Sequence, residues 1–287
     1  MKKILIVLMI VGLCSPALAE SDAAKSLEQI LGQKGTTQKD VVKFTFPRSD
    51  LKVKMGNVRV VPGLALTSWA GFKLMDEQSI VMGDLVLTNQ EVQSVIKKCG
   101  ENGIQITALH NHLIGSVPNL MYLHYVGTGN PSKLAQAIKA VLGATKTPVG
   151  KTGSKQEEKQ STDLKKLESV LGRTGHQKGN LIQFSVERND TISENNMVIP
   201  SALGTSMPIN FQMVGKKAAT TGDFVLMADE VNPVIKALSE NGIQITAVHN
   251  HMLRETPRLF FLHFWGYDTP ERLAGGIKAA LQHVNAK

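Results

Sequence analysis

Six of the eight histidines fall in one repeated spacing, and that spacing is the strongest chemical signal in the chain. The two sets are His110, His112 and His124, then His249, His251 and His263. Alternate residues of a β-strand face the same side, so the first two histidines of each set should point the same way. The third joins them if the next strand returns antiparallel. Three neutral imidazoles on a rigid sheet can bind zinc or copper, so we predict one three-histidine metal site per repeat.

Other roles remain open for these histidines. They could line a pocket for a small anionic or sugar-like ligand without metal, or be hydrogen-bonded core residues. A metal site with a nearby carboxylate base would instead suit a hydrolase or lyase. Glu91 and Glu230 are the candidate catalytic residues, because each begins a helix whose first turn should lie near the histidine end of the strand. The alternative for Glu91 is a capping box with Thr88.

The chain is built from two tandem copies of one unit. Residues 101–112 recur as residues 240–251 with a single change, and Gly83-Asp84 recurs as Gly222-Asp223. The period is a domain length, which excludes a solenoid of short repeats. The segment between the copies lacks aromatic residues and indicates a linker. We therefore assign a signal peptide (1–19), a first repeat domain (20–142), a linker (143–163) and a second repeat domain (164–287).

Around the first histidine set, hydrophobic patterns predict the elements that must position it. Strands are expected at 85–87, 104–112 and 120–127, with helices at 90–98 and 131–142. This β-α-β-β-α order suits an α+β sheet with its helices on one side. We predict two tandem copies of a ferredoxin-like β-α-β-β-α-containing domain with an antiparallel or mixed sheet.

The N-terminus has the three parts of a secretory signal peptide. Two lysines precede an apolar run at residues 4–13, and residues 17–19 are Ala-Leu-Ala. The run is shorter than the about 20 residues that cross a bilayer. We predict cleavage after Ala19, export to the periplasm or cell envelope, and no transmembrane segment in the mature chain. Lipid attachment at Cys14 is the alternative.

The net charge limits the classes of binding partner, and the cysteine count limits the disulfides that can form. The formal net charge is +8, so an exported chain of this kind could meet anionic cell-wall polymers, lipid headgroups or acidic substrates. Nucleic acid is not expected outside the cytoplasm. Cys99 would be the one cysteine left after cleavage, which excludes an internal disulfide. Its spacing from Val92 and Val95 is that of a buried helix face.

The segments around the second histidine set resemble the LppY/LpqO-type family of exported proteins. The resemblance rests on Gly-Asp-Phe-Val-Leu at 222–226, Glu-Val-Asn-Pro-Val at 230–234, Thr-Ala-Val-His-Asn-His-Met at 246–252 and Leu-His-Phe-Trp at 262–265. It covers both copies. It implies export and a duplicated domain, and it implies no reaction.

Overall fold

The computed structural model describes residues 16–38, 40–75, 78–150 and 162–287. Residues 1–15, which carry most of the predicted signal peptide and Cys14, lie outside the described residues, as do residues 151–161 of the predicted linker. Within the described ranges, no helix is long and apolar enough to cross a membrane.

The two halves have the same order of main elements. The first half contains α1 (Pro16–Leu31), β1 (Thr36–Gln38), β2 (Val41–Pro47), β3 (Val53–Met55), β4 (Val58–Val60), α2 (Pro62–Ala65), β5 (Thr67–Lys73), β6 (Ser79–Thr88), α3 (Val92–Glu101), β7 (Gln105–His110), β8 (Ser116–Val117), β9 (Leu120–Gly129) and α4 (Pro131–Leu142). The second half contains α5 (Thr162–Leu171), β10 (His176–Lys178), β11 (Leu181–Glu187), β12 (Ser193–Glu194), β13 (Met197–Val198), η1 (Ser201–Leu203), β14 (Ser206–Val214), β15 (Lys217–Leu226), α6 (Ala228–Glu240), β16 (Gln244–His249), β17 (Glu255–Thr256), β18 (Phe260–Asp268) and α7 (Pro270–Leu281). The short helix α2 and the 3-10 turn η1 occupy the same place in the two orders.

Each half forms one six-stranded sheet in which every neighbouring pair is antiparallel. The strand orders are β1-β2-β5-β6-β9-β7 and β10-β11-β14-β15-β18-β16. Three short strands of each half form an additional small sheet, β4-β3-β8 and β13-β12-β17. The predicted α+β class with two similar tandem halves is confirmed, and the open choice of sheet type resolves to antiparallel. The ferredoxin-like arrangement stays a prediction.

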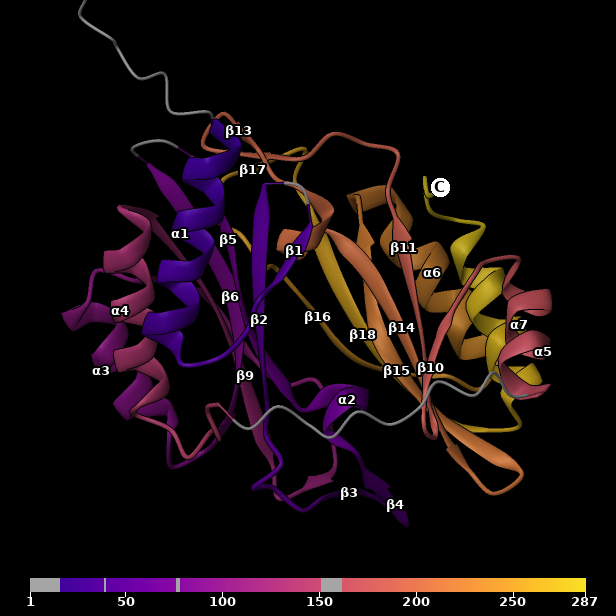
Figure 1. The fold of residues 1–287 in the computed structure, drawn as a ribbon. Coiled ribbons are helices and arrows are strands. Elements are labelled where there is room, and N and C mark those ends of the chain that lie inside the picture. Colours follow the sequence, from indigo (N-terminus) through magenta and orange to yellow (C-terminus); the bar gives the residue numbers. More distant parts are fainter. Residues whose placement is uncertain (1–15, 39, 76–77, 151–161) are drawn as a thin grey trace, which may run out of the picture.

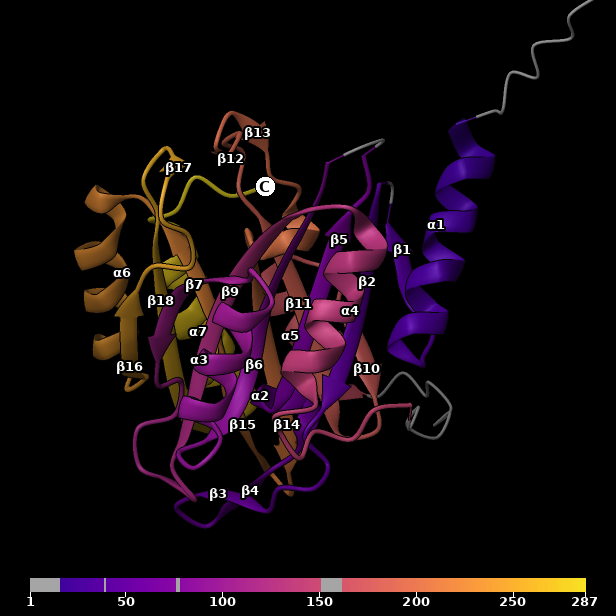
Figure 2. The ribbon, with the colours of Figure 1, turned by 90° about the vertical axis from the view of Figure 1, so that its left-hand side faces the viewer.

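The molecule has four layers, with helices outside and the two sheets facing each other in the middle (Figure 1). The turned view shows the helices of the first half packed over the outer face of their sheet (Figure 2). Leu27, Phe44, Leu123 and Ile138 belong to the apolar core under these helices. On the inner face, Ile80 and other residues of the first half share a core with the second half. The duplicated domains are therefore packed as one unit.

Polar contacts also join the halves through α2 and η1. The Asn210 side chain of the second sheet donates a hydrogen bond to the Leu64 carbonyl of α2, at 3.2 Å. In the reciprocal direction, the Lys43 ammonium of the first sheet donates to the Ala202 carbonyl of η1, also at 3.2 Å. Each half thus places a short helical turn on the other's sheet, which sets how the two inner faces oppose each other.

Two strands near the histidines have different bounds in the structure from those predicted. The strand expected at 85–87 is the long β6, and the strand expected at 104–112 is β7, which ends at His110. A register shift between Ile106 and Ala108 interrupts the pairing of β7 with β9, and β7 lies at the edge of the sheet. His112 therefore follows the strand in the connection toward β8 instead of lying within it.

Candidate metal centre

Strand register places two ligand-type residues side by side in each half. Asp84 on β6 is paired with His124 on β9, and the next strand places Ala108 beside the same histidine. Asp223 and His263 are paired in the same way in the second half. Because the Ala108 side chain is small, the longer side chains of Asp84 and His124 can occupy the space on this face of the sheet.

Close packing explains why a glycine precedes each aspartate. A Cβ atom on Gly83 would lie 2.3 Å from the Trp69 carbonyl oxygen, and one on Gly222 would lie 2.1 Å from the Pro208 carbonyl oxygen. Neither position therefore tolerates a side chain. The glycine of each Gly-Asp pair thus lets neighbouring strands pack closely. The aspartate that follows it places a carboxylate at the same level of the sheet.

The two inner faces bring both histidine sets into one cluster. Ring centroids across the interface are 3.5 Å apart for His110 and His249, 3.6 Å for His112 and His263, and 3.8 Å for His124 and His251. Within one half, His110 lies 4.9 Å from His112 and 5.0 Å from His124. The sequence predicted one site per repeat, but the structure places the two sets against each other because the sheets pack face to face.

Every member of the cluster has a buried polar atom without a hydrogen-bond partner among the described residues. These atoms are Asp84 Oδ1, both ring nitrogens of His110, the Nε2 atoms of His112, His124, His249, His251 and His263, and Asp223 Oδ1. Buried polar atoms are normally paired, and leaving one unpaired costs about 1–3 kcal/mol. Imidazole nitrogens and carboxylate oxygens are atoms that can bind a metal ion, so these residues could hold one.

Donor atoms come within 4.8 Å of one another in four overlapping groups. The groups are His110, His112, His249 and His263; His124, His249 and His251; Asp84, His112 and His124; and Asp223, His251 and His263. Two of the groups combine the halves, and two lie within a half and include its aspartate. Two donors on one zinc ion are about 3–4 Å apart, given bonds of about 2.0–2.1 Å. Small side-chain movements would therefore complete a coordination sphere.

The protonation states of the histidines suit metal binding. Burial lowers the pKa of His249 to about 4 and lowers the pKa of His124 well below its usual value, so both rings are neutral at pH 7. Neutral imidazole is the form that binds metal. Burial also raises the pKa of Asp84 to about 8 and that of Asp223 well above its usual value. A divalent cation would offset the cost of burying these two carboxylates as anions.

Backbone contacts orient several rings. The His263 Nδ1 atom lies 3.0 Å from the Gly222 carbonyl oxygen, and His249 Nδ1 lies 2.9 Å from that of Asn250. With Nδ1–H donating in each case, Nε2 is left as the free ligand atom, an arrangement typical of metal-binding histidines. Asn250 in turn donates to the Thr107 carbonyl across the interface, at 2.9 Å, so it holds the two histidine-bearing segments together.

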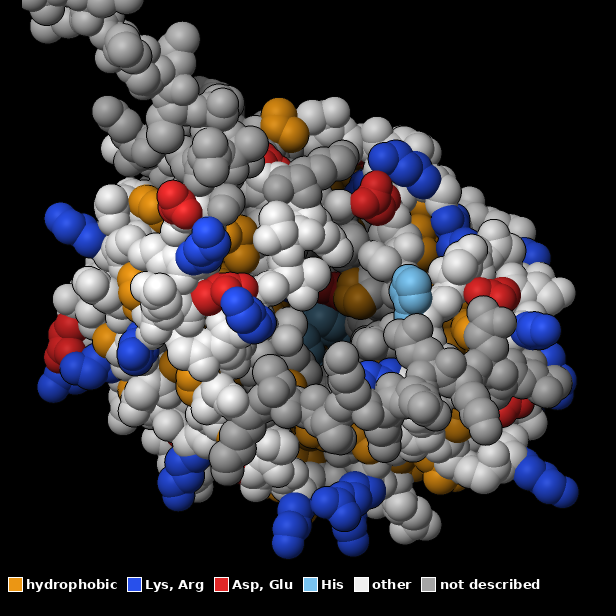
Figure 3. All heavy atoms as spheres, viewed as in Figure 1, with side chains coloured by type: hydrophobic (Ala, Val, Ile, Leu, Met, Phe, Trp, Pro, Cys, Tyr) orange, Lys and Arg blue, Asp and Glu red, His pale blue; other side chains and the backbone are white. Residues whose placement is uncertain are grey.

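Aromatic side chains form one wall of the cluster in each half. The Tyr122 ring stacks on His112 at 3.5 Å, and the Phe261 ring stacks on His251 at the same distance. The space-filling view shows a hollow between the halves with histidine and acidic side chains inside it (Figure 3). The His112 side chain keeps 14% of its surface exposed and that of His251 keeps 10%, so both rings are largely buried.

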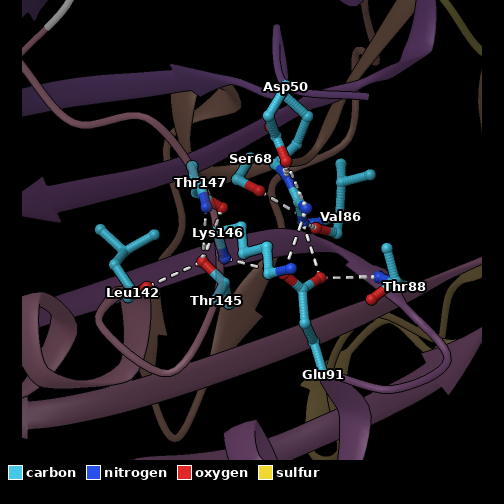
Figure 4. A network of polar contacts seen from close by, with 10 residues as sticks. Asp50, Ser68, Val86, Thr88, Glu91, Leu142, Thr145, Lys146 and Thr147 are labelled. Atoms are coloured by element: carbon cyan, nitrogen blue, oxygen red, sulfur yellow. Dashed lines mark hydrogen bonds and ion pairs between the residues drawn. The ribbon is translucent and has the colours of Figure 1, made fainter. Parts of the chain in front are cut away.

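Glu91, the first of the two predicted catalytic glutamates, lies elsewhere, in a buried ion pair (Figure 4). Arg48, which has no exposed surface, donates to both oxygens of Glu91 at 2.9 and 3.1 Å. The backbone amides of Thr88 and Lys146 donate to the same carboxylate at 2.8 and 2.7 Å. The bond from the Thr88 amide is one half of the predicted capping box, but the Glu91 amide donates to the Thr88 backbone carbonyl instead of to its side chain. Neither Glu91 nor Glu230 is among the donor groups at the histidines.

The second half repeats this network. Arg188 donates to both oxygens of Glu230 at 2.6 and 3.1 Å, and the amides of Met227 and Asn285 add further bonds. Such fully bonded carboxylates are structural anchors at the start of α3 and α6. Their geometry gives no support to a role as catalytic base.

Sequence reasoning missed Asp84 and Asp223 as members of the site. The available signal was the recurrence of Gly-Asp at the same distance before both histidine sets. An aspartate in an otherwise apolar strand, present in both copies, is expected to have a partner, because a buried unpaired carboxylate is strongly disfavoured.

Comparison with known proteins shows the family but no activity. A family model described as Domain of Unknown Function (DUF1259) matches residues 25–144 and again residues 165–283. No curated protein matches the chain. Similar solved structures include EtuB from Clostridium kluyveri (11% identity, TM-score 0.20) and the trimeric bacterial microcompartment shell protein PduB (11% identity, TM-score 0.19). Each alignment covers 86% of this chain and 90% of the other, and TM-scores this low carry no argument.

Proposed function

The chain belongs to the family described as Domain of Unknown Function (DUF1259), in two copies, and we propose that it is an exported metal-binding protein. The metal is zinc or copper, and the binding site is the cluster of six histidines and two aspartates between the halves. The observation that carries the proposal is the set of buried, unpaired donor atoms on all eight residues. A storage or carrier role in the cell envelope follows more directly than catalysis, since both candidate bases are bound by arginine.

Export and the finer family assignment are parts of the same proposal. They are supported by the basic and apolar N-terminal residues and by the LppY/LpqO-like segment at 246–252. The net charge of +6 that remains when Lys2 and Lys3 are lost from the full chain's +8 further supports a location near anionic cell-wall polymers.

Elemental analysis of the full chain, produced without a histidine tag, tests metal binding directly. We expect zinc or copper in stoichiometric amount after purification, or tight uptake of zinc in a titration of the metal-free protein. Protein that contains no metal and takes up no zinc or copper in titration would overturn the proposal.

Loss of one cluster histidine should weaken zinc binding sharply. We expect His124→Ala to lower zinc affinity by at least about 100-fold, since even outer-shell partners of a metal site contribute about 10–100-fold. His176→Ala is the matched control, because this histidine is exposed and outside the cluster. Isothermal titration of metal-free proteins measures both. Equal affinities for the two variants would show that His124 is not a ligand.

Export should leave a defined N-terminus. We expect Glu20 as the first residue of protein recovered from the cell envelope, since signal peptidase cleaves after small residues such as Ala19. Intact mass and terminal sequencing measure this. A lipid-modified N-terminus at Cys14, or retention of residues 1–19, would contradict the predicted cleavage.

A further inference from the structure

Each histidine-bearing edge strand carries one bulged threonine. Thr107 in β7 and Thr246 in β16 lie where the pairing with the neighbouring strand shifts register, so neither is paired in the ladder. A bulge leaves its extra residue unpaired and redirects it, and bulges are common next to functional sites. Both threonines are almost fully buried. Their hydroxyl and backbone groups can therefore bind the opposite half of the chain.

Thr107 uses both groups to bind the second half. Its hydroxyl donates a hydrogen bond to the His251 carbonyl at 2.5 Å, and its own carbonyl accepts one from the Asn250 side chain at 2.9 Å. We call these two bonds the latch, because they fix the segment that carries His249 and His251 against the first half.

The mirrored latch is not formed, although its residues are present. Thr246 and Asn111 occupy the positions of Thr107 and Asn250 in the other copy. The Thr246 hydroxyl is buried without a hydrogen-bond partner among the described residues, and so is the Asn111 side-chain oxygen. Buried polar atoms are normally paired, so a second conformation that pairs the Thr246 hydroxyl is expected.

The Asn119 side chain binds the amide that the mirrored latch requires. Asn111 donates its side-chain amide to the Asn119 oxygen at 2.7 Å. The second copy has Arg258 in place of Asn119. An arginine side chain has donors but no acceptor, so it cannot bind the Asn250 amide. Asn250 therefore bonds across the interface, whereas Asn111 bonds within its own half.

The histidine rings on the two sides of the interface otherwise match closely. Equivalent centroid distances are 3.6 and 3.8 Å for the close contacts (His112–His263 and His124–His251) and 6.4 Å for both longer ones (His112–His249 and His110–His251). The two halves are therefore related by an approximate two-fold axis. By this relation, Thr246 faces the segment of His112 as Thr107 faces the segment of His251.

The latched histidine lies closer to the aspartate of its own half. His251 Nε2 is 3.4 Å from Asp223 Oδ2, whereas His112 Nε2 is 4.0 Å from Asp84 Oδ2. Two donors on one zinc ion are about 3–4 Å apart, so the unlatched pair is at the upper limit of this range. A mirrored latch acts on the His112 backbone, which is the part of the chain that sets where its ring lies.

We propose that Thr246 and Asn111 are positioning residues of the metal centre, and that ion binding closes the mirrored latch. In the closed form, the Thr246 hydroxyl donates to the His112 carbonyl, and the Asn111 amide leaves Asn119 and donates to the Thr246 carbonyl. The ion favours this form because it binds more tightly where His112 lies close to Asp84. This inference rests on the proposed metal-binding function and adds a conformational step to it.

Two nearly isosteric variants compare the formed latch with the unformed one in metal-free protein. We expect Thr107→Val to lower the melting temperature by about 2–4 °C, because the His251 carbonyl loses its donor. Thr246→Val should leave the melting temperature unchanged or raise it, because its hydroxyl has no partner in the open form. Scanning calorimetry measures both. Equal losses in the two variants, or no loss for Thr107→Val, would overturn the asymmetry on which the proposal stands.

Zinc titration of the same metal-free proteins tests the closed form. We expect Thr246→Val to lower zinc affinity about tenfold, the size of effect that partners of metal ligands have, and Thr246→Ser, which keeps the hydroxyl, to retain wild-type affinity. Unchanged affinity of Thr246→Val, with normal uptake by wild type, would overturn the positioning role and leave metal binding intact. No uptake by wild type would overturn both.

Removal of the competing side chain should have the opposite effect. Asn119 is exposed, so Asn119→Ala leaves the core unchanged. We expect this variant to bind zinc about twofold to tenfold more tightly than wild type, because the open form loses one hydrogen bond and the closed form loses none. Unchanged or weaker binding in the same titration would show that Asn119 does not oppose closure, and the proposed exchange of partners would be wrong.

Discussion

Glu91→Ala should lower the free energy of unfolding by about 3–5 kcal/mol and leave the zinc content unchanged. Removing one partner of a buried ion pair is this costly because the other charge stays buried. Arg48 has no exposed surface, and it would keep only the partly exposed Asp50 as a charged partner. The bonds from the Thr88 and Lys146 amides would be lost at the same time. Urea unfolding of the metal-free protein, with elemental analysis of the loaded protein, measures both quantities.

Glu101→Ala is the matched control on the same helix. Glu101 ends α3 and pairs with Lys98 at 2.7 Å on the surface, where such a pair contributes about 0–1 kcal/mol. The two glutamates therefore differ mainly in burial. A small loss of stability for Glu91→Ala, together with loss of metal, would place Glu91 in the functional site after all.

The ion pair should also have a defined pH dependence. Burial raises the pKa of Glu91, but hydrogen bonds from Arg48 and from the backbone lower it further, so its pKa is below the ordinary value. Its contribution is then fully present above the unfolded pKa of about 4.3 and is lost as the pH falls through the folded pKa. The difference in stability between wild type and Glu91→Gln should shrink on acidification below about pH 4. A constant difference would show that Glu91 does not titrate with folding.

The histidine sets were predictable because strand alternation is a local property. His110 and His124 lie on one face once their strands pair antiparallel, and both conditions can be inferred from hydrophobic patterns. The predicted helix at 131–142 has the same bounds in the structure for a similar reason, since Asn130 caps its first turn. Such short-range signals also supported the duplicated α+β architecture.

The joint site was not predictable because it depends on how two domains pack. No local sequence pattern predicts that His112 contacts His263. This contact forms only because the inner faces of the two sheets pack against each other. The partner of Glu91 was not predictable for a related reason. The position of Glu91 at the start of a helix was inferred correctly, but its partner Arg48 lies 43 residues earlier and reaches it only in the folded sheet.

Zinc should raise the melting temperature of the metal-free chain strongly, because ions bound between the halves stabilise only the folded, packed state. At free zinc about 1,000-fold above the dissociation constant, one site contributes about 4 kcal/mol. For a chain of this size that corresponds to about 8–16 °C, and a second site adds to it. Scanning calorimetry with zinc and then with excess chelator measures the shift. Asp84→Asn should reduce the shift, whereas His283→Ala, which changes an exposed histidine outside the cluster, should keep it. If wild type melts at the same temperature with zinc and with chelator, the ions do not hold the halves together.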